Sequence, residues 1–287
     1  QNLNFFRGKR VLVTGHTGFK GTWLTFLLSE LGAEVMGYAL APERGPSHFN
    51  LLGMQDKVNH VVGDVRDAFA LNNSFQSFKP DIVFHLAAQA LVKKSYTEPA
   101  LTFDTNVMGS VNLLDAVWQC SSVRSLVFIT SDKCYENLEW VWGYRENDQL
   151  GGHDPYSASK AAAEILFSAY SRSFLSSRPT LGAATARAGN VIGGGDWAED
   201  RLVPDIIRAL QQGEPVRIRN PNAIRPWQHV LEPIGGYLYL GAKMIEDPIS
   251  YSQAWNFGPE NENIITVSEL VTKLIKSYGK GHWKDTS

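Results

Sequence analysis

The chain has 287 residues, enough for about two domains of ordinary size with a full hydrophobic core. Hydrophobic residues make up 44% and charged residues 20%, a composition that excludes disorder, collagen and low complexity. The 27 Lys and Arg nearly balance the 29 Asp and Glu, for a formal charge of −2, so no polybasic field would hold nucleic acid or an anionic membrane. We therefore expect neither as a partner.

Cysteine usage and the start of the chain bear on the compartment. Cys120 and Cys134 are too few for a disulfide framework, and no Cys or His cluster has metal-ligand spacing, so no metal site is predicted. Residues 1–10 contain charges but no apolar signal-peptide run, and no stretch of about 18 apolar residues occurs. These features predict a soluble, cytoplasmic protein.

Short apolar runs alternate with segments of helical period from Arg10 onward, which is typical of parallel βαβ units. The first strand is predicted over 11–14 and the first helix over 23–31, with Gly32 at its C-terminal cap. Further strands are expected over 34–39, 60–63, 82–87, 125–131 and 182–191, and helices over 68–78, 101–120 and 157–174. This alternation predicts an α/β fold, a doubly wound parallel sheet of the Rossmann type.

The pattern changes after Gly193, where recurring prolines break shorter elements. Helices are expected over 203–212, 234–246 and 267–278, with a loop over 217–229. We therefore expect a dinucleotide-binding domain over 1–192 and a smaller, mixed substrate-binding lobe over 193–287, with room for some elements to interleave. The end, 279–287, is polar and stops without a closing element, so the sequence leaves open whether further residues follow.

A glycine-rich turn lies between the first predicted strand and helix. Gly15, Gly18 and Gly21 recur at three-residue intervals, and the N–H groups at the start of a helix suit a dinucleotide pyrophosphate. The alternative is a tight strand-to-helix turn without a ligand. Because both the strand and the helix are predicted, we favour the ligand.

Two later residues bear on the same ligand. Asp64, at the end of a later strand, suits either an adenine amino group or the cap of the next helix. The second strand is not followed by the acidic residue that holds the ribose hydroxyls in many NAD sites, and Arg44 stands slightly beyond. Arg44 suits a 2′-phosphate or is a solvated loop charge, so these residues leave NAD and NADP both open.

Tyr156 and Lys160 are four residues apart, which places both side chains on one helix face. An ammonium near a phenol lowers the pKa of the phenol, so that a phenolate is available to remove a hydroxyl proton. The alternative is a surface pair without function. Thr130-Ser131-Asp132-Lys133 favours the functional interpretation, because it follows a strand at the edge where parallel sheets present their ligands.

Together, several motifs resemble the extended short-chain dehydrogenase/reductase family over nearly the whole chain: Gly15/Gly18/Gly21, His85-Leu86-Ala87-Ala88, Asn106, Ser131 and Tyr156/Lys160. Within it, residues 130–135, 140–146, 187–197 and 225–230 resemble the CDP-glucose branch of the nucleotide-sugar 4,6-dehydratases. The resemblance implies an NAD-dependent lyase that acts on CDP-glucose for deoxysugar synthesis (O-antigen of lipopolysaccharide). It also implies a homodimer or homotetramer.

The resemblance further implies the site residues. The catalytic residues would be Ser131, Asp132, Lys133, Tyr156 and Lys160. The cofactor would contact Gly15, Thr17, Gly18, Phe19, Lys20, Gly21, Asp64, Val65, Leu86, Ala87, Ala88, Asn106, Tyr156 and Lys160. The substrate would contact Gln89, Ser95, Asn190, Arg219 and Arg225, for which the alternatives are ordinary polar residues or solvated loop charges. His85, at a strand end, is expected to be structural.

The implied chemistry is a net loss of water. Tyr156 would deprotonate the sugar 4-hydroxyl while the C4 hydride passes to the nicotinamide, and the 4-ketone would acidify C5–H. A base would then remove that proton as Asp132 protonates the leaving 6-hydroxyl, before the hydride returns to C6. Related dehydratases have a glutamate as the C5 base where this chain has Lys133. Lys133 is therefore either the base, as a neutral amine, or a positioning group.

Two other functions compete with this interpretation. A nucleotide-sugar 4-epimerase needs Tyr156 and Lys160 but no acid for a leaving 6-hydroxyl, so Asp132 argues against it. A non-catalytic dinucleotide sensor would keep the fold and lose the chemistry, so the intact Ser131, Tyr156 and Lys160 argue against it. The fold alone does not separate these functions, and the site residues must.

Overall fold

The structure is a computed structural model that describes residues 3–42, 47–260 and 265–287. Arg44 lies outside the described residues. The chain forms two compact units. The first comprises Gln1–Ala188 and Leu231–Phe257, and the second comprises Gly189–Val230 and Gly258–Ser287.

The first unit is built on a seven-stranded sheet in the order β11-β6-β5-β4-β1-β2-β3. All neighbouring strands are parallel. The strands are β1 (Arg10–Thr14), β2 (Glu34–Ala39), β3 (Asn59–Val62), β4 (Ile82–His85), β5 (Ser125–Ile129), β6 (Gly182–Ala188) and β11 (Ala254–Phe257). The strand order reverses between β1 and β4, which is the point where doubly wound folds bind their ligands. The predicted α/β fold is confirmed.

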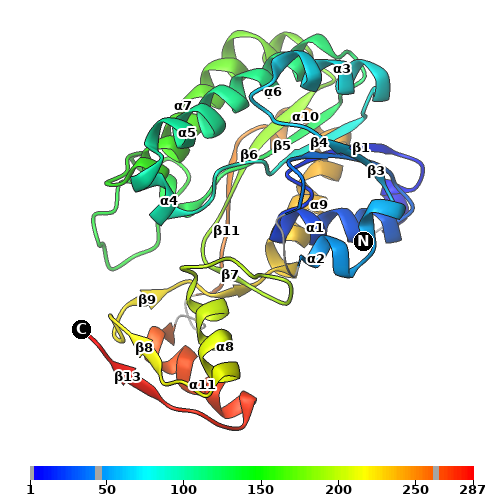
Figure 1. The fold of residues 1–287 in the computed structure, drawn as a ribbon. Coiled ribbons are helices and arrows are strands. Elements are labelled where there is room, and N and C mark those ends of the chain that lie inside the picture. Colours follow the sequence, from blue (N-terminus) through cyan, green and yellow to red (C-terminus); the bar gives the residue numbers. More distant parts are fainter. Residues whose placement is uncertain (1–2, 43–46, 261–264) are drawn as a thin grey trace. The chain divides into compact units, whose positions relative to one another are not determined.

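Helices cover both faces of this sheet (Figure 1). On one face, α3, α6 and α7 pack through Phe75, Leu113 and Phe167 against Leu12 and Phe128 of the strands. On the other face lie α1 and α9. The helices of this unit are α1 (Phe19–Glu30), α2 (His48–Leu51), α3 (Ala68–Phe78), α4 (Val92–Thr97), α5 (Pro99–Phe103), α6 (Gly109–Gln119), α7 (Pro155–Ser173), α9 (Leu231–Glu246) and α10 (Pro248–Tyr251).

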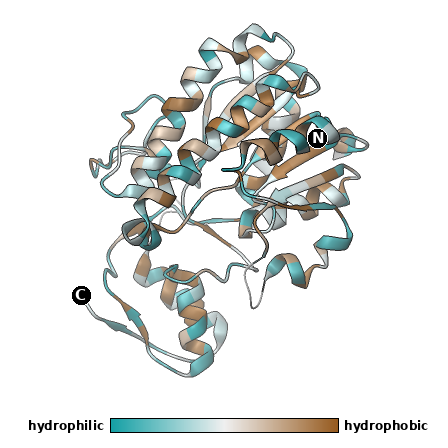
Figure 2. Ribbon diagram, turned by 45° about the horizontal axis from the view of Figure 1, so that its top comes forward, coloured by the Kyte–Doolittle hydropathy of each residue, from teal (hydrophilic) through white to brown (hydrophobic). Residues whose placement is uncertain are grey.

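This double cover explains the apolar runs of the strands. Residues 11–13, 82–84 and 126–128 are almost completely buried, whichever face they point to. Figure 2 shows the strands of the sheet mainly brown, whereas the helices that cover them also carry teal. Because a parallel sheet loses water from both faces, its strands read as continuous hydrophobic runs and not as an alternation.

The helix expected over 101–120 is not a regular α-helix. It comprises α5, a π-helical segment at Asp104–Met108, and α6. The π-helical segment places Asn106 in the interior, where its side chain bonds the backbone of Gln89. Such single-turn π segments frequently mark functional sites, and here one places a predicted cofactor contact.

The strand expected over 182–191 is confirmed over 182–188 and wrong in its last three residues. β6 ends at Ala188, and β7 (Val191–Ile192) pairs instead with β10 (Gln228–His229) in the second unit. The sequence also missed β11, which pairs with β6. This pairing, together with α9, places Leu231–Phe257 in the first unit, whereas the expected division at 192/193 placed these residues in the second lobe.

The second unit has a small core of its own. Ile206, Leu210, Val216, Ile218 and Val271 form it. Its remaining elements are α8 (Leu202–Gln212), α11 (Val267–Tyr278), β8 (Val216–Ile218), β9 (Ile224–Arg225), β12 (Ile265–Thr266) and β13 (Trp283–Asp285). The expectation that the end has no closing element is wrong, because β13 pairs with β8 and Trp283 packs against the core. The loop expected over 217–229 contains β9 and β10.

Candidate active site

The turn between β1 and α1 places glycine backbone, which has no side chains, at the carboxyl edge of the sheet. Gly15 has a φ of 73°, and a Cβ there would lie 2.7 Å from the Ala87 nitrogen. A Cβ at Gly21 would lie 2.1 Å from the Gly15 carbonyl oxygen. Gly18 is the N-cap of α1, and among the described residues no side chain caps this helix end. The site therefore fits a dinucleotide pyrophosphate, which needs close backbone approach at a helix N-terminus.

Hydrogen bonds fix this turn to the neighbouring strands. The Thr14 hydroxyl lies 2.7 Å from His85 Nδ1 and accepts from the Ala87 N–H at 3.2 Å. The Thr17 hydroxyl donates to the Leu40 carbonyl, just after β2, at 3.1 Å. Burial lowers the pKa of His85 to about 3, so its ring is neutral at pH 7. These contacts agree with the structural role expected of His85.

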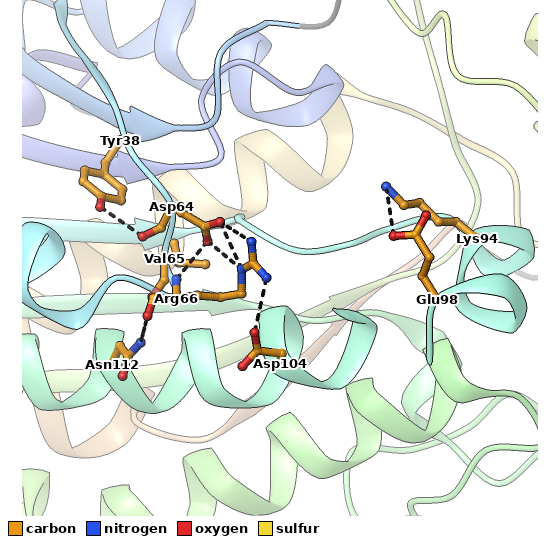
Figure 3. A network of polar contacts seen from close by, with 8 residues as sticks. All are labelled: Tyr38, Asp64, Val65, Arg66, Lys94, Glu98, Asp104 and Asn112. Atoms are coloured by element: carbon orange, nitrogen blue, oxygen red, sulfur yellow. Dashed lines mark hydrogen bonds and ion pairs between the residues drawn. The ribbon is translucent and has the colours of Figure 1, made fainter. Parts of the chain in front are cut away.

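The side chain of Asp64 is bonded by Arg66 (Figure 3). Nε and Nη2 of Arg66 lie 3.0 and 2.6 Å from Asp64 Oδ2, and Nη1 lies 3.3 Å from Asp104. The hydrogen bonds from Arg66 lower the pKa of Asp64 and keep it a carboxylate. The capping alternative for Asp64 is wrong, because Asp67 is the residue that caps α3, by accepting from the Ala70 N–H.

The backbone beside Asp64 is held from two sides, as Figure 3 also shows. The Tyr38 hydroxyl donates to the Asp64 carbonyl at 3.0 Å, and the Asn112 amide donates to the Val65 carbonyl at 3.0 Å. A Cβ at Gly109 would lie 2.7 Å from the Val65 side chain, so α6 passes close to this segment. The segment predicted to contact adenine therefore has a fixed backbone.

The continuation of β5 forms the turn that carries the predicted acid. The Ser131 hydroxyl donates to Asp132 at 3.0 Å and accepts from the Lys133 N–H at 3.2 Å. Burial raises the pKa of Asp132, although the charges of Lys133 and Lys20 and the bond from Ser131 oppose this. Asp132 therefore holds its proton to a higher pH than an exposed aspartate. The side chain of Lys133 is exposed, so its ammonium keeps its hydration.

The first turns of α7 present Tyr156 and Lys160 beside this turn. Asp154 caps the helix by accepting from the Ser157 N–H at 2.9 Å. Tyr156 and Lys160 are only 8% and 7% exposed. Burial, and then the charge of Lys20, lowers the pKa of Lys160 to about 8. Because Lys20 acts electrostatically on both Asp132 and Lys160, the glycine turn lies beside the predicted catalytic residues.

Asn106 fixes the segment that follows β4. It accepts from the Gln89 N–H at 2.8 Å and donates to the Gln89 carbonyl and to the Ser159 hydroxyl. The Gln89 side chain bonds the backbone of Leu91 in both directions. Ser95 is fully buried and donates to a carbonyl of α4. These internal bonds favour the alternative that Gln89 and Ser95 are structural, and their substrate contacts stay a prediction.

A buried ion pair that the sequence did not predict lies beside this site. Glu164 accepts from Nε of Arg187 at 2.9 Å and from Nη2 at 2.7 Å. The two side chains are 3% and 5% exposed. The available signal was the spacing of Tyr156, Lys160 and Glu164, since Glu164 continues the same helix face by four residues.

In the second unit, Asn190, Arg219 and Arg225 line one cavity of about 450 Å³. The structure therefore brings together three residues that are 35 positions apart at most in the sequence, each predicted to contact substrate. Trp227 adds an aromatic wall. Guanidinium groups suit a diphosphate and an aromatic face suits a base, so Arg219, Arg225 and Trp227 suit a nucleoside diphosphate; Asp200, Asp205 and Glu214 also line the cavity.

Two further searches of the described residues concern metal ligands and membrane-spanning helices. In the described ranges, no group of three or more His, Cys, Asp or Glu side chains is placed to hold a metal ion. Among the helices described, none is long and apolar enough to cross a membrane.

The sheet order and the glycine turn define a dinucleotide-binding protein of the doubly wound class, with a buried tyrosine and lysine beside the turn. Residues 11–252 match the NAD dependent epimerase/dehydratase family, and the chain belongs to that family.

Known relatives include several nucleotide-sugar enzymes. A CDP-glucose 4,6-dehydratase of Salmonella typhimurium is 52% identical over 280 residues, which are 96% of this chain and 78% of that protein. The structure of a Thermus thermophilus UDP-glucose 4-epimerase with NAD superimposes with a TM-score of 0.81 at 27% identity, covering 96% of this chain and 85% of that one. A Bacillus anthracis dTDP-glucose 4,6-dehydratase with NAD gives 0.80 at 23% identity, covering 95% and 82%, which supports the fold.

Proposed function

We propose that this chain is a CDP-glucose 4,6-dehydratase, a lyase that uses bound NAD and forms CDP-4-dehydro-6-deoxyglucose. The observation that most supports it is Asp132, a carboxyl group whose pKa is raised by burial, beside Ser131 in a site that also contains Tyr156 and Lys160. A 4-epimerase has no leaving 6-hydroxyl and needs no such acid. The 52% identity to the Salmonella relative supports CDP-glucose as the substrate.

The residues of the first unit suit NAD. Gly15, Gly18 and Gly21, with Thr17, Phe19 and Lys20, would hold the pyrophosphate at the start of α1. Asp64 and Val65 would contact the adenine, and Leu86, Ala87, Ala88 and Asn106 would lie along the rest of the cofactor. A bound nicotinamide would supply the acceptor for the hydride from C4 of the sugar and the donor of that hydride to C6.

The protein groups move the protons. Tyr156 accepts the proton of the 4-hydroxyl, because the Lys160 ammonium favours its phenolate form, and Ser131 bonds the same oxygen. The new 4-ketone acidifies C5–H. A base then removes the C5 proton while Asp132 donates its proton to the leaving 6-hydroxyl, which departs as water. When the hydride returns to C6, a proton that has exchanged with solvent is delivered to C5, which completes the 4-keto-6-deoxy sugar. Lys133 lies next to Asp132 as the candidate C5 base, but its exposure favours a role in positioning the substrate.

The second unit would bind the nucleotide. Arg219 and Arg225 supply positive charge for the diphosphate, Asn190 supplies an amide, and Trp227 supplies a face for the base, all in the lining of one cavity. The enzyme would act as a homodimer or homotetramer in the cytoplasm and supply a deoxysugar for surface polysaccharide.

The test is to incubate the protein with NAD and CDP-glucose in deuterated water, with UDP- and dTDP-glucose in parallel, and to identify the sugars by NMR. We expect a 4-keto-6-deoxy sugar with deuterium at C5, from CDP-glucose alone. A sugar inverted at C4 with its 6-hydroxyl intact would make the chain an epimerase, and unchanged sugar with bound NAD would make it a sensor.

A further inference from the structure

One buried ion pair holds both ends of the turn Ser131–Cys134. At the start of the turn, the Thr130 hydroxyl donates to the Glu164 carboxylate. At its end, Nη1 of Arg187 donates to the Tyr135 hydroxyl at 2.7 Å. Glu164 and Arg187 are themselves joined by two hydrogen bonds. The turn that carries Ser131 and Asp132 is therefore fixed at both ends by one ion pair.

The guanidinium of this unit is in turn held by other segments. Nη1 of Arg187 also donates to the Glu146 carbonyl at 2.9 Å. The Tyr135 hydroxyl donates to Asn256 on β11 at 2.8 Å, and the Asn256 N–H donates to the Glu146 carboxylate at 2.8 Å. The pair is therefore fixed by contacts from β6, β11, α7 and the loop after β5.

The same carboxylate acts on Lys160. Among the groups that affect this ammonium, Lys20 on α1 opposes its charge and Glu164 on α7 favours it. His85 on β4 has a pKa of about 3 and the Cys134 thiol a pKa of about 12, so both are neutral at pH 7. Of the other charged groups on or beside the elements packed against α7, Asp104 bonds Arg66, Lys94 bonds Glu98 and Asp115 bonds Tyr170. Asp132 and Lys133 lie on the turn itself, and Arg187 bonds the Glu164 carboxylate. Glu164 thus opposes the effect of Lys20 in part, while Arg187, bonded to the same carboxylate, carries the opposite charge.

Stability alone explains this pair poorly. Removing two charges from water costs about as much free energy as their attraction returns, and well-packed apolar residues often replace such pairs without loss. We propose that Glu164 is a positioning residue of the reaction: with Arg187 it fixes the turn Ser131–Cys134, and it supplies the negative charge that acts on Lys160. The inference rests on the proposed function for the identity of the reaction.

The test compares variants in the pH dependence of sugar oxidation and in the titration of Tyr156. Tyr156 is followed by ultraviolet difference absorption against Tyr156→Phe in protein without substrate. Glu164→Gln is expected to lower kcat about tenfold or more, because the turn is displaced. Loss of the negative charge lowers the pKa of Lys160, so the alkaline limb of the kcat profile should move to lower pH by about one unit. Because Lys160 then loses its positive charge at lower pH, Tyr156 should titrate at higher pH.

Three other variants separate the two effects. Thr130→Val removes one anchor of the turn and is expected to lower kcat with the alkaline limb unmoved. Glu164→Asp keeps the charge and is expected to keep the limb. The matched control is Arg178→Lys, because Arg178 also donates to backbone carbonyls from a partly buried position but has no contact with the turn. It is expected to change the melting temperature and neither catalytic readout.

A folded Glu164→Gln protein with the kcat and alkaline limb of the wild type would overturn the inference. If Glu164→Gln does not fold, wild-type kcat in both Glu164→Asp and Thr130→Val would overturn it instead. A wild-type protein that oxidises no sugar would refute the proposed function, while the titration of Tyr156 would still test the charge of Glu164.

Discussion

Asp132 shows how one side chain depends on its surroundings. Its neighbours Lys133 and Lys20 are cations, which favour the carboxylate, yet burial outweighs them and raises its pKa. A carboxyl group that holds its proton to a higher pH than an exposed aspartate is suited to protonate a leaving hydroxyl group.

We therefore expect Asp132→Asn to slow formation of the 4-keto-6-deoxy sugar by about 10²- to 10⁴-fold, because an amide has no proton to donate. Oxidation at C4 should be less affected, since Tyr156 and Lys160 remain. NMR of the sugars in deuterated water measures both. The control is Glu30→Gln, which removes an exposed carboxylate. Product at the wild-type rate from Asp132→Asn would assign the acid to another group.

Two buried histidines predict an acid-sensitive fold. Burial, and then His60, lowers the pKa of His16 to about 3, and burial lowers that of His85 to about 3. An unfolded histidine titrates near 6.5, so below that pH the unfolded chain binds protons that the folded chain does not. The free energy of unfolding should therefore fall between pH 6.5 and 3, by at most about 1.4 kcal/mol per pH unit for each histidine.

Urea unfolding at several pH values measures this slope. His16→Gln is expected to reduce the slope of the free energy of unfolding against pH by the contribution of one histidine. This reduction is expected whatever the effect of the substitution on stability at pH 7. His282→Gln, at an exposed position, is the control and should leave the slope unchanged. Equal slopes in all three proteins would contradict the assignment.

The start of α1 packs closely against the turn before it, and this packing requires glycine. Gly21 lies within α1, where alanine is the better helix former by about 1 kcal/mol. A methyl group there would nonetheless lie 2.1 Å from the Gly15 carbonyl oxygen, so the turn must move.

Gly21→Ala is therefore expected to weaken NAD binding at least about tenfold, because the backbone can no longer approach the pyrophosphate. Isothermal titration calorimetry measures the affinity. Gly143→Ala is a matched control, because a Cβ at Gly143 would meet no atom within 4 Å. Unchanged NAD affinity in Gly21→Ala would argue against the turn as the cofactor site.

At the scale of the whole molecule, the proposed ligands use different units. The glycine turn belongs to the first unit, and the cavity with Asn190, Arg219 and Arg225 belongs to the second. A ligand that binds the folded protein raises its stability by RT ln(1 + [L]/Kd), so each ligand reports on its own site.

NAD and CDP should each raise the melting temperature of the wild type. Gly21→Ala should lose the response to NAD and keep the response to CDP, and Arg225→Ala should do the reverse. Thermal shift at fixed ligand concentrations checks both. If Arg225→Ala kept its full response to CDP, the cavity would not be the nucleotide site.

The sequence predicted those features that depend on neighbouring residues. Apolar runs and helical spacing predicted the βαβ order, and the glycine spacing predicted the turn before α1. The four-residue spacing of Tyr156 and Lys160 predicted that both side chains lie on one face of a helix, and both are buried on α7. The motifs also predicted the family to which the chain belongs.

Only the tertiary structure decided how distant residues pair. It joined Thr130, Glu164 and Arg187, and it bonded Asp64 to Arg66 while Asp67 capped α3. In the tertiary structure β11 pairs with β6 in the first unit, and β6 ends at Ala188. The physical reason is that periodicity and turn chemistry act within a few residues, whereas these pairs form only after the sheet has set its strand order and register.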